Sequence, residues 1–279
     1  MLKHQGLRRT HIHNVRLAIL LSLAAGLVNA EGFPGFSVLT TNVTGHAAIF
    51  AENISIKAWT TSWVIALWML LFLAGAFTSS LIIDLIGKNQ RYSNLLPLSL
   101  EFLILIAIAT IGDHYKNSTA AHQLFAGSLL FAMGMQNALV SIISKKVVRT
   151  THLTGTFTDL GIELAQLKFT KPEKKSDLRS RIGLKLFIIS SFITGALLGA
   201  YAFRSFQYYS FFAPAAFLIY ALLYDVFRVN AKRYYRKIGN KIKGNKLIAH
   251  EIPVPEVKKI IIKRIIEKEV WLPGINEIL

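Results

Sequence analysis

The 279-residue chain contains no cysteine, which excludes disulfides, thiolate metal sites and thiol catalysis. It is also poor in charge: 17% of its residues are charged, whereas a soluble domain usually carries about a quarter. Acidic residues are especially scarce, with 15 Asp and Glu against 32 Lys and Arg. The sequence has no HExxH, GxSxG or Walker pattern, and no His–Cys cluster. We therefore expect no enzyme, no bound metal and no cofactor.

The chain does contain long apolar blocks. Hydrophobic residues make up 53% of the sequence, and a helix needs about 20 mostly apolar residues to cross a bilayer. The six blocks cover residues 17–32, 61–86, 95–111, 124–143, 182–203 and 208–227. They predict an all-α, polytopic membrane protein with about six transmembrane helices. The first block, which follows a basic N-terminus, also fits a cleavable signal peptide, but it takes part in an internal repeat.

Three landmarks recur in the same order in both halves of the chain. GLVNA at 26–30 matches GMQNA at 134–138, TNVTG at 41–45 matches THLTG at 151–155, and FLAGAF at 72–77 matches FITGAL at 192–197. The collinear order predicts a duplication. We expect a cytoplasmic N-terminus at 1–16, one membrane unit at 17–113, a second at 114–229 and a basic tail at 230–279.

The distribution of Lys and Arg predicts how the two units are oriented. If the segments at the Thr-Gly motifs enter and leave on one side, the cytoplasmic side holds 29 Lys and Arg and the outside holds 3. If both segments cross fully, giving eight spans, the division is 26 to 6. The positive-inside rule favours six spans with both termini cytoplasmic, without excluding eight. Two three-span units then lie in opposite senses, as inverted repeats in many transporters do.

The Thr-Gly motifs predict a broken or re-entrant helix in each unit, because unpaired backbone cannot face lipid. We expect the threonines to cap short helices whose N-termini would attract a small anion. The predicted substrate-binding residues are Thr41, Asn42, Thr44, Gly45, Thr151, His152, Thr154 and Gly155. Helix capping alone remains the equal alternative. Histidine as a residue type can change its charge near neutral pH, which makes His46 and His152 candidates, although a lone His is more often structural.

Acidic residues inside apolar segments are costly and mark candidate functional positions. Glu101 lies within the third block, and Glu52 and Glu163 follow the motif glycines by seven and eight residues. We predict proton coupling at these three positions. A solvated or amide-paired carboxylate near a helix end remains open as the alternative. Glu31 and Asp159 also flank the two motifs.

The net charge of +17 does not indicate nucleic-acid binding, because Lys and Arg gather in the predicted cytoplasmic segments. The tail at 230–279 begins with a basic stretch interleaved with Tyr, which suits an anionic lipid surface. A solvated helix or a partner-binding helix in the tail would fit equally well. The expected partners are the bilayer, anionic lipid and a small solute, and the chain is compatible with a homo-oligomer.

The second half contains QNA at 136–138, RTT at 149–151 and TGT at 154–156. These stretches resemble the signature of the YoaK-type family of bacterial membrane proteins, a domain of unknown function. The first half departs from the family pattern, since His46 stands where Asn is usual. The resemblance covers roughly residues 15–228. It implies an inner-membrane protein of about six spans and names no activity.

Our leading functional expectation is a secondary transporter or permease for a small solute, for which an anion is one candidate. The alternative is a non-transporting membrane scaffold or sensor that acts through the basic tail. An intramembrane enzyme is the weakest of the three hypotheses, because no catalytic constellation is present.

Overall fold

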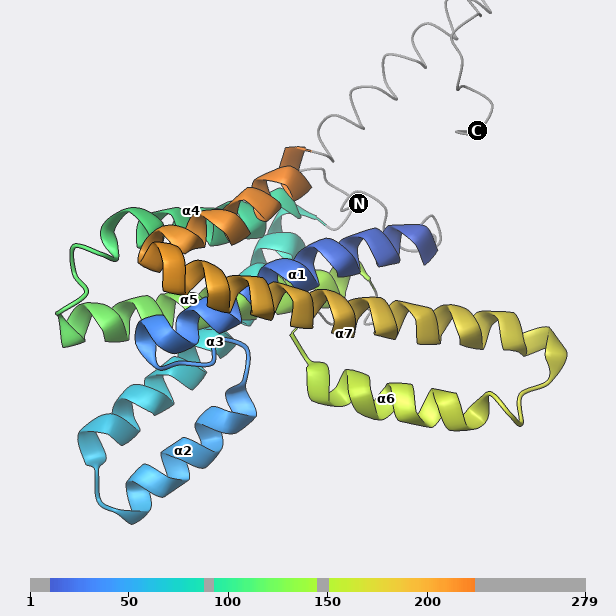
Figure 1. Ribbon diagram of the computed structural model, residues 1–279, viewed down its shortest axis with the longest axis horizontal. Helices are drawn as coiled ribbons and strands as arrows, with labels where there is room; N and C mark the ends of the chain where they lie inside the picture. The colour runs from blue at the N-terminus through green and yellow to red at the C-terminus, as the bar shows by residue number, and fades with distance from the viewer. Residues whose placement is uncertain (1–10, 88–92, 145–150, 224–279) are drawn as a thin grey trace, which may run out of the picture. The chain divides into compact units, whose positions relative to one another are not determined.

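The computed structural model describes residues 11–87, 93–144 and 151–223, and these residues form helices joined by short turns (Figure 1). The all-α prediction is therefore confirmed for the described residues. The predicted tail at 230–279 and the first ten residues of the N-terminal segment lie outside them.

Seven α-helices and one short 3-10 helix make up the described elements. They are α1 (His11–Phe36), α2 (Val43–Ser55), α3 (Trp59–Ile86), α4 (Leu95–Ile111), α5 (Thr119–Ile143), α6 (Leu153–Gln166), α7 (Pro172–Phe206) and η2 (Gln207–Phe211). A further helical stretch covers residues 212–223. The helices α2 and α6, which follow the Thr-Gly motifs, have 13 and 14 residues. Neither has the roughly 20 residues that a full span requires.

Four described stretches are long and apolar enough to cross a membrane: Ala18–Phe36, Trp59–Ile86, Thr119–Ile143 and Pro172–Leu223. The helix Leu95–Ile111 is apolar but shorter. The last of the four stretches contains α7, η2 and the helix after them, and the chain turns back at η2 (Figure 1). Gln207 takes up a left-handed conformation there, with φ of 51°. The molecule is thus a polytopic membrane protein.

The helices α1 and α7 pack most extensively against each other, and α3 and α5 form the second large interface. Both pairs run parallel. In the first pair, Leu23 lies against Gly195, while further along both helices Gly35 lies beside the Phe203 ring. In the second pair, the Trp68 indole Nε1 donates to the Gln123 carbonyl at 3.1 Å.

The helix α1 runs antiparallel to α5. Near the start of α1, the Leu21 carbonyl accepts a 2.8 Å hydrogen bond from Gln136, late in α5. At the end of α1, the Phe36 ring lies 5.6 Å from the imidazole of His122, near the start of α5. Figure 1 shows the same relation, with α1 and α5 running in opposite directions. The α1–α7 pair therefore runs opposite to the α3–α5 pair.

Glycines bring the backbones of both parallel pairs into direct contact. In α1–α7, a β-carbon at Gly26 would collide with the Phe192 carbonyl, and one at Gly195 with the Leu23 carbonyl. In α3–α5, Gly134 meets the carbonyl of Phe72, and Gly75 meets that of Phe131. A residue without a β-carbon is required at each of these contacts. Small residues at helix interfaces are also how membrane helices approach closely.

The core lies along α1 and α5, which contribute fully buried residues such as Leu21, Val28, Leu129 and Met133. The helix α3 differs, because apolar side chains such as Trp63 stand exposed along most of it. Apolar side chains on the outside of a membrane protein face hydrocarbon, which is as apolar as they are. The exposed face of α3 is therefore suited to lipid contact.

Two glycines of α7 provide a matched test of the close contacts. We expect Gly195→Ala to lower the free energy of unfolding by about 1–3 kcal/mol, because the Leu23 backbone must move to admit a methyl group. Gly183, on the same helix, has no atom within 4 Å of the β-carbon position. We expect Gly183→Ala to leave stability unchanged or to raise it by about 0.5–1 kcal/mol. Thermal or denaturant unfolding in detergent measures the stability of both variants. Equal effects of the two substitutions would contradict the close contact between Gly195 and the Leu23 backbone.

Candidate functional site

The first Thr-Gly motif forms the N-terminus of α2 and is tied back to α1. The N-cap residue is Asn42, whose Oδ1 accepts from the Gly45 backbone N–H at 2.9 Å. The Asn42 side chain lies directly over Gly45, where a β-carbon would come within 2.8 Å of Nδ2. Thr41 donates through both its backbone N–H (3.1 Å) and its hydroxyl (3.0 Å) to Oδ1 of Asn29 in α1. The motif thus fixes where α2 begins relative to α1.

His46 lies in the first turn of α2 and is buried, with 3% of its surface exposed. Its Nε2 lies 3.0 Å from the Leu39 carbonyl, and its ring makes an edge contact with Trp68 of α3 at 6.0 Å. The imidazole therefore holds the chain between α1 and α2 in place. This environment is that of a structural histidine.

The second Thr-Gly motif forms the N-terminus of α6. Its N-cap residue is His152, which occupies the position of Asn42 and makes no side-chain cap hydrogen bond. The His152 ring fills the place that a β-carbon on Gly155 would take. The Thr156 hydroxyl donates to the His152 carbonyl at 2.8 Å. In both motifs, then, the glycine is needed because the side chain three residues earlier folds over it.

The expectation that the motif threonines cap the short helices is wrong for Thr44 and Thr154. The caps are Asn42 and His152, and both helices begin two residues before the motif glycine. Thr44 and Thr154 fall in the first helical turn with their side chains exposed. The cap residues Asn42 and His152 are also exposed, so these positions have the same exposure in both motifs.

The two motifs lie on separate helix pairs. The helix α2 packs on α3, α6 packs on α7, and α2 and α6 make no contact with each other. Thr151 is buried, with 7% exposure, while Thr41 is half-buried. That both motifs bind one solute therefore stays a prediction.

The three predicted proton-coupling carboxylates have different surroundings. Glu52 is exposed on α2. Glu163 of α6 is nearly buried, and its Oε1 forms an ion pair with Lys185 of α7 at 2.8 Å and a longer one with Arg181 at 3.7 Å. Glu101 of α4 is completely buried, and neither of its oxygens has a hydrogen-bond partner. Glu163 thus has a clear structural partner, whereas Glu101 has none.

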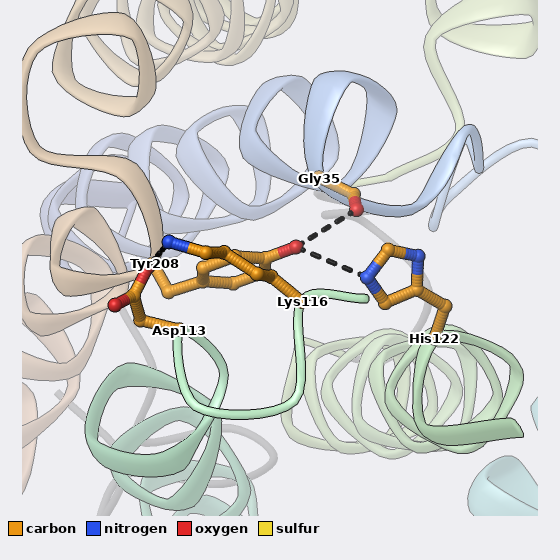
Figure 2. Close-up of polar contacts among 5 residues, drawn as sticks. All are labelled: Gly35, Asp113, Lys116, His122 and Tyr208. Carbon is orange, nitrogen blue, oxygen red and sulfur yellow. Dashed lines mark hydrogen bonds and ion pairs between the residues drawn. The ribbon is translucent and has the colours of Figure 1, made fainter. Parts of the chain in front are cut away.

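A polar cluster that the sequence analysis missed lies where α1 and α7 end and α5 begins. The Tyr208 hydroxyl of η2 donates to the Gly35 carbonyl at 3.4 Å and lies 3.3 Å from Nε2 of His122 (Figure 2). Asp113 and Lys116, in the turn before α5, form an exposed ion pair at 3.1 Å. The ring of Phe36 packs against both His122 and Tyr208. No sequence motif joins residues so far apart in the chain.

Buried polar atoms without partners lie at two further places, one next to this cluster and one in the second half of α5. Glu31 of α1 and Ser210 of η2 are buried, and none of their side-chain oxygens forms a hydrogen bond. Oδ1 of Asn137 in α5 is likewise buried and unpartnered, although the matching atom of Asn29 accepts two hydrogen bonds. Each buried polar group of this kind calls for an explanation, such as a function, a bound water or an ion.

Comparison with known proteins agrees with the membrane assignment. A family model described as "Protein of unknown function (DUF1275)" matches residues 17–224. UPF0700 transmembrane protein YoaK of Bacillus subtilis (strain 168) is 26% identical over 210 residues, covering 74% of this chain and 91% of that protein. No solved structure matches the chain. The predicted family resemblance is confirmed, and the matched range ends before the basic tail.

The two polar residues at the start of α2 provide a test of capping. We expect Asn42→Ala to lower the free energy of unfolding by about 0.5–2 kcal/mol, because the Gly45 N–H loses its acceptor. Thr44→Val, in the same turn, removes an exposed hydroxyl that caps nothing and should change stability by less than about 0.5 kcal/mol. Unfolding of both variants in detergent measures the difference. A larger loss of stability for Thr44→Val than for Asn42→Ala would show that Thr44, and not Asn42, caps the helix.

Proposed function

The chain belongs to the DUF1275 family of proteins of unknown function, and from this premise we propose that it is a secondary transporter or permease for a small solute. We further propose that it lies in the bacterial inner membrane with both termini in the cytoplasm. The observation that carries the proposal is the reciprocal packing of two similar halves, each of which holds one short helix at a Thr-Gly motif.

The glycine contacts support a duplication. Gly26 and Gly134 occupy the same place in the repeated GLVNA and GMQNA sequences, as do Gly75 and Gly195 in FLAGAF and FITGAL. The first helix of each half packs, through its glycine, on the third helix of the other half. Such an exchange is what two copies related by a pseudo-two-fold axis would make.

Helix direction supports six spans in two inverted units. The helix α1 is antiparallel to α5, which is parallel to α3, so α1 and α3 run in opposite directions. If α1 and α3 both span the membrane, a chain that leaves α1 on one side begins α3 on that same side, which favours an α2 that does not cross. The same reasoning applies to α6 between α5 and α7. Both short helices would therefore be re-entrant, entering from opposite sides.

The N-terminal ends of α2 and α6 are suited to a small anionic group. Free backbone N–H groups and the helix dipole make such an end partly positive. Neither helix has an acidic residue in its first turn to compete for that charge. Exposed hydroxyls of Thr44 and Thr154 and the exposed side chains of Asn42 and His152 stand at these ends. We propose that these groups bind the solute.

A solute screen followed by two matched variants tests this function. Purified protein is heated with a panel of small carboxylates, phosphate and sulfate, because a ligand that binds only the folded state raises its stability. We expect one class to stabilise the protein and to be taken up into proteoliposomes. Thr44→Val and Thr154→Val should each weaken its binding about 12–160-fold, as loss of one hydrogen bond to a charged group does.

Thr158→Val is the control for these variants. Thr158 lies one turn further along α6, and its hydroxyl donates to the Thr154 carbonyl at 3.0 Å. This substitution should leave solute affinity unchanged. If Thr44→Val and Thr154→Val also leave it unchanged, the solute does not bind at these helix ends. If no protein-dependent uptake occurs for any stabilising solute, the transport function itself is wrong.

A further inference from the structure

Glu31 is a completely buried carboxyl group in the last third of α1, and no cation among the described residues pairs with it. None of its surface is exposed, and neither oxygen forms a hydrogen bond or ion pair with a described residue. The hydroxyl that faces it belongs to Ser210 of η2, which is buried and equally unpartnered. The two groups are adjacent without a hydrogen bond of ordinary geometry between them.

The charged and titratable groups on the elements packed against α1 do not neutralise Glu31. Those elements are α5, α7 and η2. At this end of the molecule they carry His122 on α5, Tyr201 and Arg204 on α7, and Tyr208 and Tyr209 on η2. Tyr201, Arg204 and Tyr209 are exposed. His122 and Tyr208 contact each other instead.

An ionised carboxylate without partners in apolar surroundings is very costly. Binding a proton removes that charge. The resulting carboxylic acid both donates and accepts hydrogen bonds, so it can pair with a hydroxyl that also does both. Small side-chain adjustments would then allow Glu31 and Ser210 to satisfy each other. These surroundings therefore favour a protonated Glu31 over a permanently charged one.

The polar cluster in Figure 2 lies between the surface and a position one helical turn from Glu31. Gly35 lies one helical turn after Glu31 in α1, and its carbonyl accepts from Tyr208, two residues before Ser210. Tyr208 in turn contacts His122, and Asp113 lies close enough to Tyr208 to act on it electrostatically. The side chain of Asp113 is 43% exposed. Polar groups thus extend from the α4–α5 turn to within one helical turn of Glu31.

We propose that Glu31 is a proton-binding site that couples solute movement to protons, reached from the end of the molecule that carries Tyr208 and His122. The coupling role rests on the transport function proposed above, whereas proton binding does not. The step is simple protonation: a carboxylate oxygen gains a proton, and no other bond changes. Glu101 is equally buried, but among the described residues no hydroxyl group interacts with it as Ser210 does with Glu31.

Infrared spectroscopy of the purified protein tests proton binding without a known solute. The C=O stretch of a protonated carboxyl is measured as the pH rises, and again in D₂O. We expect a band that exchanges with D₂O, loses intensity with rising pH, and is absent from Glu31→Gln. Ser210→Ala should shift the band, because its hydroxyl partner is gone. Glu52→Gln, which alters an exposed carboxyl group, should leave it unchanged.

Two results would overturn the proposal. The first is a Glu31→Gln spectrum identical to that of the unmodified protein, or a band that is lost in Glu101→Gln instead. The second is a Glu31 band that neither titrates nor exchanges while the protein is folded. Should Glu31→Gln fail to fold, the shift expected in Ser210→Ala decides, and an unshifted band rejects the site.

The coupling role has its own readout. Once a transported solute is identified, Glu31→Gln should abolish the pH dependence of its uptake. Uptake that keeps its pH dependence in Glu31→Gln would reject coupling at Glu31. Proton binding at Glu31 in a protein that transports none of the tested solutes would reject the proposed function and leave the proton site intact.

Discussion

Direct contact between glycines and backbone carbonyls is the constraint on which the rest of this fold depends. In lipid the hydrophobic effect does not press helices together, so close packing and interhelical hydrogen bonds must do so. Here Gly26 and Gly195 join α1 to α7, and Gly75 and Gly134 join α3 to α5. The Gln136 side chain then links the two pairs through the Leu21 carbonyl. The central position of α1 and α5, and the opposite directions of the two pairs, follow from these contacts.

Because α1 packs on α7 and α3 packs on α5, the helices α2 and α6 lie outside the two large interfaces. Each packs mainly on the helix that follows it, and its N-terminus is held by a cap residue folded over a glycine. The glycine of each motif therefore recurs for a local reason: Asn42 and His152 need the space over Gly45 and Gly155. The same geometry leaves Thr44 and Thr154 exposed at two partly positive helix ends. The packing of the cap residues over the glycines and the proposed solute-binding role thus depend on the same local arrangement in each motif.

The sequence predicted those parts of the molecule that depend on local pattern. Apolar blocks predicted the long helices, and the Thr-Gly motifs predicted two short helices, which begin two residues before the motif glycines and not just after them. The identity of the caps could not be predicted, because Asn and Thr are both good N-cap residues and only the backbone decides between them. The pairing of Glu163 with Lys185 depends on how α6 packs on α7. Glu31 and Ser210 are joined only by tertiary structure, so no spacing in the chain could reveal them.

The sidedness of three positions tests the inverted six-span arrangement most directly. The chain has no cysteine, so single cysteines at the exposed residues Ser55, Asn117 and Ser176 can be labelled with a membrane-impermeant reagent. Re-entrant α2 and α6 place residues 55 and 117 outside and residue 176 in the cytoplasm. We predict that Ser55→Cys and Asn117→Cys are labelled in intact cells, and that Ser176→Cys is labelled only after the cells are opened. If α2 and α6 cross the membrane, all three lie in the cytoplasm, and the absence of labelling at 55 and 117 in intact cells would contradict the arrangement.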